Sequence, residues 1–409
     1  MSETFLSQQV VPGIVPETPR LAKPAPVKHP RDFRLDFFRG IALFFIFIDH
    51  IPDNKFRYVT LRSVAFSDAA ELFIFISGFT AAMVYGRAMD RDGFLLASAR
   101  IYRRVWQLYT AHLCLFLIFS AEVAYTVLHF NNPLFADELR VGDFLDAPAA
   151  TVIHVLTLGF QPSYLDILPL YIFLLGIFPL ILAALRVNVW LAVVPSILIY
   201  MIARIWSVSM PGYPEGRTWY FNPLAWQLLF VIAATFGFAA GQGRRLLPDY
   251  RWLLRLCLAF VAIGAVIEIT WTLHEMTGWF PALFYRQLWP ISKSNLPILR
   301  LVSMLALGVV VAAYVPKNAA FLTSRLGWLA VICGQNSLEI FCLSILLSVL
   351  ANMAQTIYGT SLPVQIVINF AGIAAMLNLG LLLAWFEGNG KLPSRPRTVL
   401  AVPTAGKPA

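Results

Sequence analysis

The stretch RLDFFRGIALFFIFIDH, residues 34–50, places Arg39 and His50 at the two ends of an otherwise apolar run. An ionisable side chain inside a membrane span is costly, so each one is a candidate functional group. The eleven-residue step from Arg39 to His50 corresponds to about 16 Å of helix, or half a bilayer. The run therefore predicts a helix with a charge at one membrane face and an imidazole that reaches towards the other.

The composition of the whole chain supports a membrane setting. Hydrophobic residues make up 59% of the chain and charged residues 13%, whereas soluble proteins average about 45–50% and 25%. We therefore predict an all-α polytopic membrane protein in contact with a lipid bilayer. The net charge of +9 is explained by the positive-inside bias, so no nucleic-acid partner is expected. The four cysteines lie in apolar segments without metal-site spacing, and we expect neither disulfides nor a metal site.

About ten apolar runs have lengths near that of a membrane span, and we predict a transmembrane helix in each. The runs cover residues 36–52, 68–87, 104–129, 164–185, 189–208, 223–241, 253–273, 298–315, 330–352 and 364–386. In the second run, Ser77-Gly78 is better explained as a small-residue helix contact than as a chemical group.

Lys and Arg residues gather in alternate connections of the predicted spans. They are concentrated in the tail before the first span and in the connections after the second and the sixth, whereas the segment 130–163 is acidic. Because basic connections stay in the cytoplasm, both termini are predicted to be cytoplasmic. The predicted parts are a disordered basic and proline-rich tail (1–35), a transmembrane domain (36–388) and a C-terminal tail (389–409).

Four arginines are predicted to meet at the cytoplasmic end of the bundle. Arg34 and Arg39 flank the start of the first span, and Arg103 and Arg104 lie near the start of the third. Guanidinium groups bind phosphate well, so these residues form a candidate pocket for a phosphorylated carrier. The positive-inside bias alone is the alternative explanation.

The opposite end of the first span carries candidate acid–base groups. A histidine such as His50 can act as a neutral base near physiological pH, and the adjacent Asp49 can fix its tautomer. Glu71, near the start of the second span, lies at a depth that allows it to meet His50. The alternative is a hydrogen-bonded histidine at the membrane interface.

Further polar and aromatic residues lie at the same predicted face. Trp219, Asn222 and Gln227 belong to the stretch WYFNPLAWQLLF, and Lys293 and Arg300 precede and begin the eighth span. The aromatic residues fit an interfacial belt, and they also fit a stacking surface for sugar rings. Arg300 is the cation that we expect to lie deepest in the membrane.

Six stretches of the chain resemble the OpgC family, within the transmembrane acyltransferase superfamily. They occur in the family order and the resemblance covers roughly residues 30–390. The stretches are RLDFFRGIALFFIFIDHIP, FIFISGFTAAMVYGRA, RIYRRVWQLYTAH, WYFNPLAWQLLF, KSNLPILRLVSMLALG and GQNSLEIFCLSILLS. OpgC proteins are membrane succinyltransferases that modify osmoregulated periplasmic glucans.

The resemblance implies a membrane O-acyltransferase in the bacterial inner membrane. Its co-substrate would be acyl-CoA, with succinyl-CoA the donor that the family implies, and it would have no permanently bound cofactor. The acceptor would be a periplasmic glucan, and glucan synthesis proteins are candidate partners. On this model the inner arginines engage the CoA phosphates, while His50 acts as a general base or as a nucleophile.

A succinyl group carries a carboxylate, so this model also requires a cation near the reaction centre. The sequence leaves the choice open among Arg57, Arg62, Arg217, Lys293 and Arg300.

Two other functions use the same residues. A transporter or flippase for an acidic or glycan substrate would line its path with buried charges, and a structural partner of a glucan synthesis complex would need no chemistry. The sequence contains no recognisable inverted repeat, which weakens the transporter hypothesis.

Overall fold

A computed structural model describes residues 31–130, 137, 139–244, 246, 251–288 and 292–391. The chain divides into two compact units, Met1–Asp32 and Phe33–Ala409, and the described helices all belong to the second. The predicted tails lie outside the described residues apart from 31–35 and 389–391. Within the described ranges the secondary structure is helical except for one antiparallel bridge between Pro211 and Thr218. The all-α prediction is therefore confirmed.

Among the described residues, seven helices are long and apolar enough to cross a membrane. They are α2 (Ala69–Asp92), α3 (Phe94–Phe130), α7 (Ile167–Val187), α9 (Pro223–Gly241), α10 (Arg251–Thr277), α15 (Ser337–Tyr358) and α16 (Leu362–Glu387). Two shorter helices, α8 (Val189–Ile205) and α12 (Ile298–Tyr314), are also apolar. The chain is thus a multi-pass membrane protein.

The remaining helices are short or connect these spans. They are α1 (Phe33–Asp49), η1 (Lys55–Val59), η2 (Leu61–Ser63), α5 (Gly142–Asp146), α6 (Pro148–Leu156), α11 (Tyr285–Leu288), α13 (Ala320–Thr323) and α14 (Arg325–Gln335).

One predicted span differs from the structure. The run 330–352 was predicted as a single helix, but α14 ends at Gln335 and α15 begins at Ser337. Between them the side-chain amide of Asn336 donates to the carbonyl of Ile332 at 3.0 Å. An asparagine side chain competes in this way with the backbone ladder and favours a helix boundary. The prediction of one continuous helix here is wrong.

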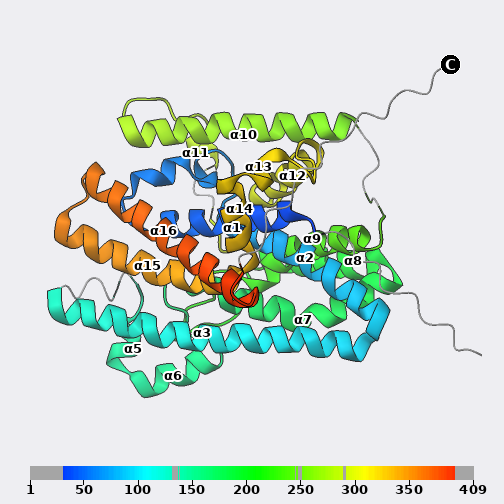
Figure 1. Cartoon of the computed structure of the whole chain (residues 1–409), viewed down its shortest axis with the longest axis horizontal. Coiled ribbons are helices and arrows are strands. Elements are labelled where there is room, and N and C mark those ends of the chain that lie inside the picture. The colour runs from blue at the N-terminus through cyan, green and yellow to red at the C-terminus, as the bar shows by residue number, and fades with distance from the viewer. Residues whose placement is uncertain are drawn as a thin grey trace, which may run out of the picture. The chain divides into compact units, whose positions relative to one another are not determined.

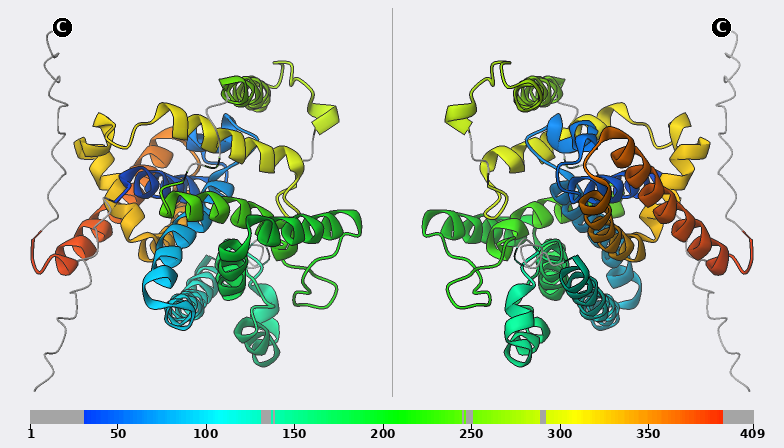
Figure 2. Two further views of the ribbon diagram at one scale, coloured as in Figure 1. Left: turned by 90° about the vertical axis from the view of Figure 1, so that its right-hand side faces the viewer. Right: turned by 90° about the vertical axis from the view of Figure 1, so that its left-hand side faces the viewer.

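Helix α1, which contains the Arg39–His50 run, lies in the middle of the bundle (Figure 1). It packs on α2, α14 and α15. Ala42 and Leu43 are fully buried and Phe47 is 1% exposed. Helix α10, in contrast, lies at one edge and contacts mainly α12 (Figures 1 and 2). Helix α1 is therefore enclosed by protein, and the side chain of Arg39 near its start is only 13% exposed. Enclosure by protein is how a membrane protein tolerates charged groups.

Two glycines allow the central helices to approach closely. A Cβ at Gly334 in α14 would lie 1.8 Å from the carbonyl oxygen of Asp36 in α1. A Cβ at Gly78 in α2 would lie 2.5 Å from the carbonyl oxygen of Phe230 in α9. The small-residue contact predicted at Ser77-Gly78 is confirmed, and both contacts fix the position of helices that carry polar groups.

We expect Gly334→Ala to destabilise the protein by about 1–3 kcal/mol or more, because backbone atoms cannot yield to the added methyl group. The measurement is thermal unfolding of the purified protein in detergent. Gly176→Ala in α7 is the matched control, since a Cβ there meets nothing within 4 Å. Equal effects of the two substitutions would contradict the close packing of α1 on α14.

Candidate functional site

Within the described part of the chain, two cavities lie along helix α1. The Arg39 cavity has a volume of about 180 Å³, and Arg39, Thr80, Tyr85, Arg104 and Tyr171 are among its lining residues. The His50 cavity has a volume of about 260 Å³, and its lining includes Asp49, His50, Arg62, Tyr164, Asp166 and Lys293.

The two cavities lie one after the other along the bundle, and each helix that lines both passes from one cavity to the next. Residues 68–70 of α2 and its cap line the His50 cavity, and residues 73–85 of α2 line the Arg39 cavity. Ile167 at the start of α7 and Phe341 in α15 line both cavities. Eleven residues make about three helical turns, so Arg39 and His50 share one face of α1. The cavities are therefore consecutive, and Ile167 and Phe341 line both where they adjoin. We refer to these two residues as the partition.

The structure brings two of the four predicted inner arginines to the Arg39 cavity. Arg39 donates to the hydroxyl of Thr80 at 2.7 Å and lies 3.9 Å from Asp36. Arg104 lines the same cavity. Arg34 instead donates to the carbonyl of Val315 at 2.6 Å. Arg103 is exposed on α3 and is not among the residues that line the cavity.

His50 is held by an aromatic contact. Its ring centroid lies 4.4 Å from that of Tyr164, and its Nδ1 atom is buried without a hydrogen bond to any described residue. A buried polar atom of this kind calls for a partner such as a water or a substrate. Tyr164 itself has a φ of +74°, a left-handed conformation that is costly for a large side chain and is common at functional sites.

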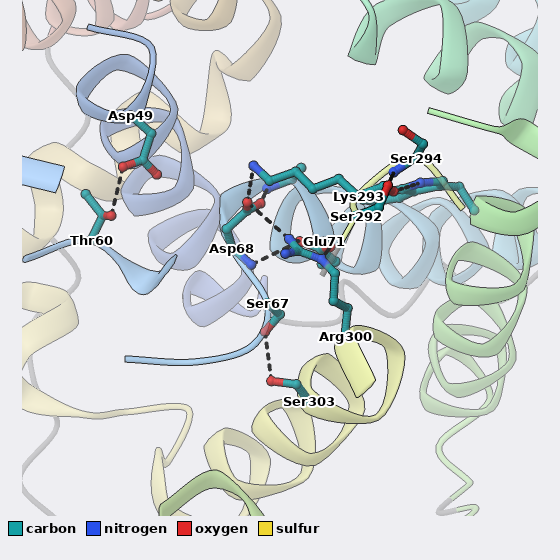
Figure 3. A network of polar contacts seen from close by, with 12 residues as sticks. Asp49, Thr60, Ser67, Asp68, Glu71, Ser292, Lys293, Ser294, Arg300 and Ser303 are labelled. Atoms are coloured by element: carbon teal, nitrogen blue, oxygen red, sulfur yellow. Dashed lines mark hydrogen bonds and ion pairs between the residues drawn. The ribbon is translucent and has the colours of Figure 1, made fainter. Parts of the chain in front are cut away.

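The two carboxylates predicted to support His50 have other partners. Asp49 lines the His50 cavity and accepts a hydrogen bond from Thr60 at 2.8 Å (Figure 3). Glu71 is fully buried, and its two oxygens accept from Arg300 at 2.5 and 2.9 Å. Glu71 therefore belongs to a buried ion pair and does not meet His50.

Asp68, which lines the His50 cavity, lies beside this ion pair (Figure 3). Its side chain caps α2 and contacts both the ammonium of Lys293 and, at 3.1 Å, the guanidinium of Arg300. Burial alone would raise the pKa of Asp68, but the two cations lower it well below its usual range. Lys293 lines the cavity, whereas Arg300 is buried beneath it and is not among the lining residues.

The predicted aromatic and amide residues at the start of α9 are buried in the protein. Asn222 caps α9 and donates to the carbonyl of Val208 at 2.7 Å. Gln227 bonds to Ser196, and Trp219 is 8% exposed. Their neighbours Tyr220 and Phe221 line the His50 cavity instead. The stretch reaches the cavity, but through residues other than those that the sequence indicated.

Sequence reasoning did not single out Tyr164, Asp166 or Arg140, which also line the His50 cavity. Burial raises the pKa of Asp166 to about 6, although Arg140 and Lys293 act to lower it. The only signal in the sequence is a cluster of acidic residues in the segment that precedes α7. That cluster does not indicate which acid turns towards α1.

The fold and the cavities define the class of protein. It is a multi-pass, all-helical membrane protein with cavities that include charged residues at the two ends of a central helix. A family model described as OpgC protein matches residues 31–388, and the chain belongs to this family. The resemblance seen in the sequence is thereby confirmed. Neither a curated protein nor a solved structure matches the chain.

We expect Arg300→Met to lower the free energy of unfolding by about 3–5 kcal/mol, because it leaves the buried Glu71 carboxylate without its cation. Thermal unfolding in detergent measures this loss. Arg91→Met is the control, since the side chain of Arg91 is 61% exposed and pairs with Asp92 at the surface, where an ion pair adds little. A similar loss in both variants would argue against the buried pair as a structural element.

Proposed function

We propose that this protein is a membrane O-acyltransferase. It moves a succinyl or other acyl group from cytoplasmic acyl-CoA to hydroxyl groups of a periplasmic glucan in the bacterial inner membrane. Membership of the OpgC family supports the glucan acceptor and the acyl donor. The proposal includes the three predicted parts of the chain, about ten spans and two cytoplasmic termini.

One observation carries the proposal: two cavities lie on one face of α1 and meet at the partition formed by Ile167 and Phe341. A donor with its phosphates at Arg39 and its thioester at His50 must cover about 16 Å. An extended pantetheine arm has a length of that order. The arrangement thus suits a reaction in which donor and acceptor approach from opposite sides.

The charges at the two ends of the bundle support this orientation. Arg87 and Arg91 end α2, and Arg100 and Arg103 begin α3, at the end of the bundle where the Arg39 cavity lies. Basic residues favour the cytoplasmic side. The Arg39 cavity then faces the cytoplasmic donor and the His50 cavity faces the periplasmic acceptor.

Two routes of acyl transfer are open to His50. As a general base, its imidazole takes the proton of a glucan hydroxyl while that oxygen attacks the thioester carbonyl. The C–S bond then breaks, and the imidazolium returns the proton to the departing CoA thiolate. As a nucleophile, the imidazole attacks the carbonyl first, the C–S bond breaks and the CoA thiolate leaves, which forms an acyl-imidazole. The glucan hydroxyl then attacks that carbonyl, the C–N bond breaks to restore the imidazole, and the hydroxyl proton neutralises the thiolate. In both routes a ring nitrogen without a protein hydrogen bond is the reacting atom. Asp49 and Lys293 lie on the walls of the same cavity.

A flippase is the second candidate, and the same observation favours it. Two cavities that adjoin at Ile167 and Phe341 also suit alternating access to a site within the membrane. The two functions differ in their product, because an acyltransferase changes the covalent structure of the glucan and a flippase only its location.

We expect His50→Ala to abolish acylation of the glucan and to leave its export intact, because the reacting nitrogen is lost while α1 remains packed. Mass spectrometry of periplasmic glucans measures acidic substituents and total glucan together. Thermal unfolding of the variant checks that it folds. Normal substitution of the glucan in this strain would refute the catalytic role, and loss of export would favour the flippase.

We expect Phe341→Leu to raise the acceptor-independent release of CoA from acyl-CoA, because a smaller side chain opens the partition to water from the His50 cavity. A thiol reagent measures free CoA from the purified protein without glucan. Phe73→Leu is the matched control, since Phe73 is also buried but lines the Arg39 cavity and not the His50 cavity. Equal hydrolysis in both variants would contradict a partition at Phe341.

A further inference from the structure

We infer that Arg62 and Arg140 bind an anionic group within the His50 cavity, and that this group is the carboxylate of a dicarboxylic acyl donor. The identity of the anion rests on the proposed function. The site itself rests on the distribution of charge around the cavity.

Most of the cationic residues that could bind the succinyl carboxylate already form ion pairs with acidic residues of the protein. Arg57 pairs with Glu275, Arg217 lies 3.4 Å from Asp143, and Arg300 is bound to Glu71 and Asp68. Lys293 lines the cavity, but its ammonium contacts Asp68. An anion that bound one of these groups would share it with a carboxylate that already lies against it.

Arg62 and Arg140 differ from these residues. Both line the His50 cavity, both are exposed, and neither guanidinium forms a hydrogen bond or an ion pair with a described residue. They come from separate elements: Arg62 lies in η2, and Arg140 precedes α5. Arg140 has a φ of +56°, and its backbone N–H donates to the carbonyl of Asp137 at 3.0 Å.

The acids of the cavity do not pair with these arginines. Asp49 accepts from Thr60, and Asp68 is bound by Lys293 and Arg300. Asp166 lines the cavity as well, and it forms no hydrogen-bonded ion pair with either arginine. The N–H donors of the two guanidinium groups therefore form no hydrogen bond with an acceptor among the described residues.

A guanidinium binds a carboxylate through two parallel hydrogen bonds, which gives both energy and direction. A succinyl group places its carboxylate three carbon–carbon bonds of about 1.5 Å each from the carbonyl carbon. A cavity of about 260 Å³ accommodates that group with the carbonyl at His50. A glucan hydroxyl is neutral, so the acceptor itself does not require these cations.

The test compares two donors that differ in charge. Succinyl-CoA and butyryl-CoA have acyl chains of equal length, and butyryl-CoA has a methyl group in place of the carboxylate. Hydrogen bonds to a charged group are worth about tenfold to hundredfold in affinity. We expect Arg62→Gln to lower the ratio of kcat/KM for succinyl-CoA over butyryl-CoA at least tenfold, and Arg62→Lys to retain most of it.

Arg57→Gln is the matched control, since Arg57 is a nearby arginine that pairs with Glu275 and is not among the lining residues. It should leave the ratio unchanged. An unchanged ratio in Arg62→Gln would overturn the inference. So would an equal fall in kcat/KM for both donors when the acceptor is a neutral glucan. If kcat/KM fell only with glucans that carry anionic substituents, the anion bound by Arg62 would belong to the acceptor and not to the donor. That result would overturn the donor assignment.

A binding measurement separates this inference from the proposed function. Succinate should raise the unfolding temperature of the wild-type protein more than butyrate does, and Arg62→Gln combined with Arg140→Gln should remove the difference. If the wild-type protein transfers neither acyl group, the proposed function fails, and this measurement still decides whether the anion site exists. Equal effects of succinate and butyrate on the wild-type protein would refute the site.

Discussion

The cost of placing charge in a membrane is the constraint on which this structure depends. Arg39 and His50 stand on one helix, and lipid would not tolerate them. The bundle therefore encloses α1 between α2, α14 and α15. A close contact at Gly334 holds α14 against α1, and one at Gly78 holds α2 against α9. Enclosure of this kind leaves cavities that include polar and charged residues at the two ends of α1, since side chains that meet charges cannot all be apolar. The position of the candidate site follows from that requirement.

A buried ion cluster stabilises the wall of the His50 cavity. Asp68 and Glu71 at the start of α2 hold Arg300 from α12 and, through Asp68, Lys293 from the preceding connection (Figure 3). Each charge in the cluster would be costly alone, and each is paired. The cluster joins segments that are more than two hundred residues apart in the chain. It therefore fixes the geometry of the cavity and leaves His50 as the group for chemistry in our proposal.

The sequence predicted the helical class well and the pairing of side chains poorly. Apolar runs identify spans because each helix satisfies its own backbone hydrogen bonds, which is a local property. Asn336 divides one predicted span because its side chain competes for the backbone, an effect that hydropathy does not register. Glu71 has the depth expected for a partner of His50, but depth along one helix does not fix the direction of a side chain. Trp219 and Asn222 turn into the protein while Tyr220 and Phe221 turn to the cavity.

By itself, the sequence determined that this is a polytopic helical membrane protein of the OpgC family, and that Arg39 and His50 lie at opposite ends of one helix. These properties depend on composition, hydropathy and helical rise, which are set by neighbours in the chain. Only the tertiary structure decided that the two residues open into separate cavities, that Ile167 and Phe341 divide them, and which cations are already paired. These properties depend on contacts between helices that are distant in sequence, and the energy of a buried charge is set by the partner that the fold brings to it.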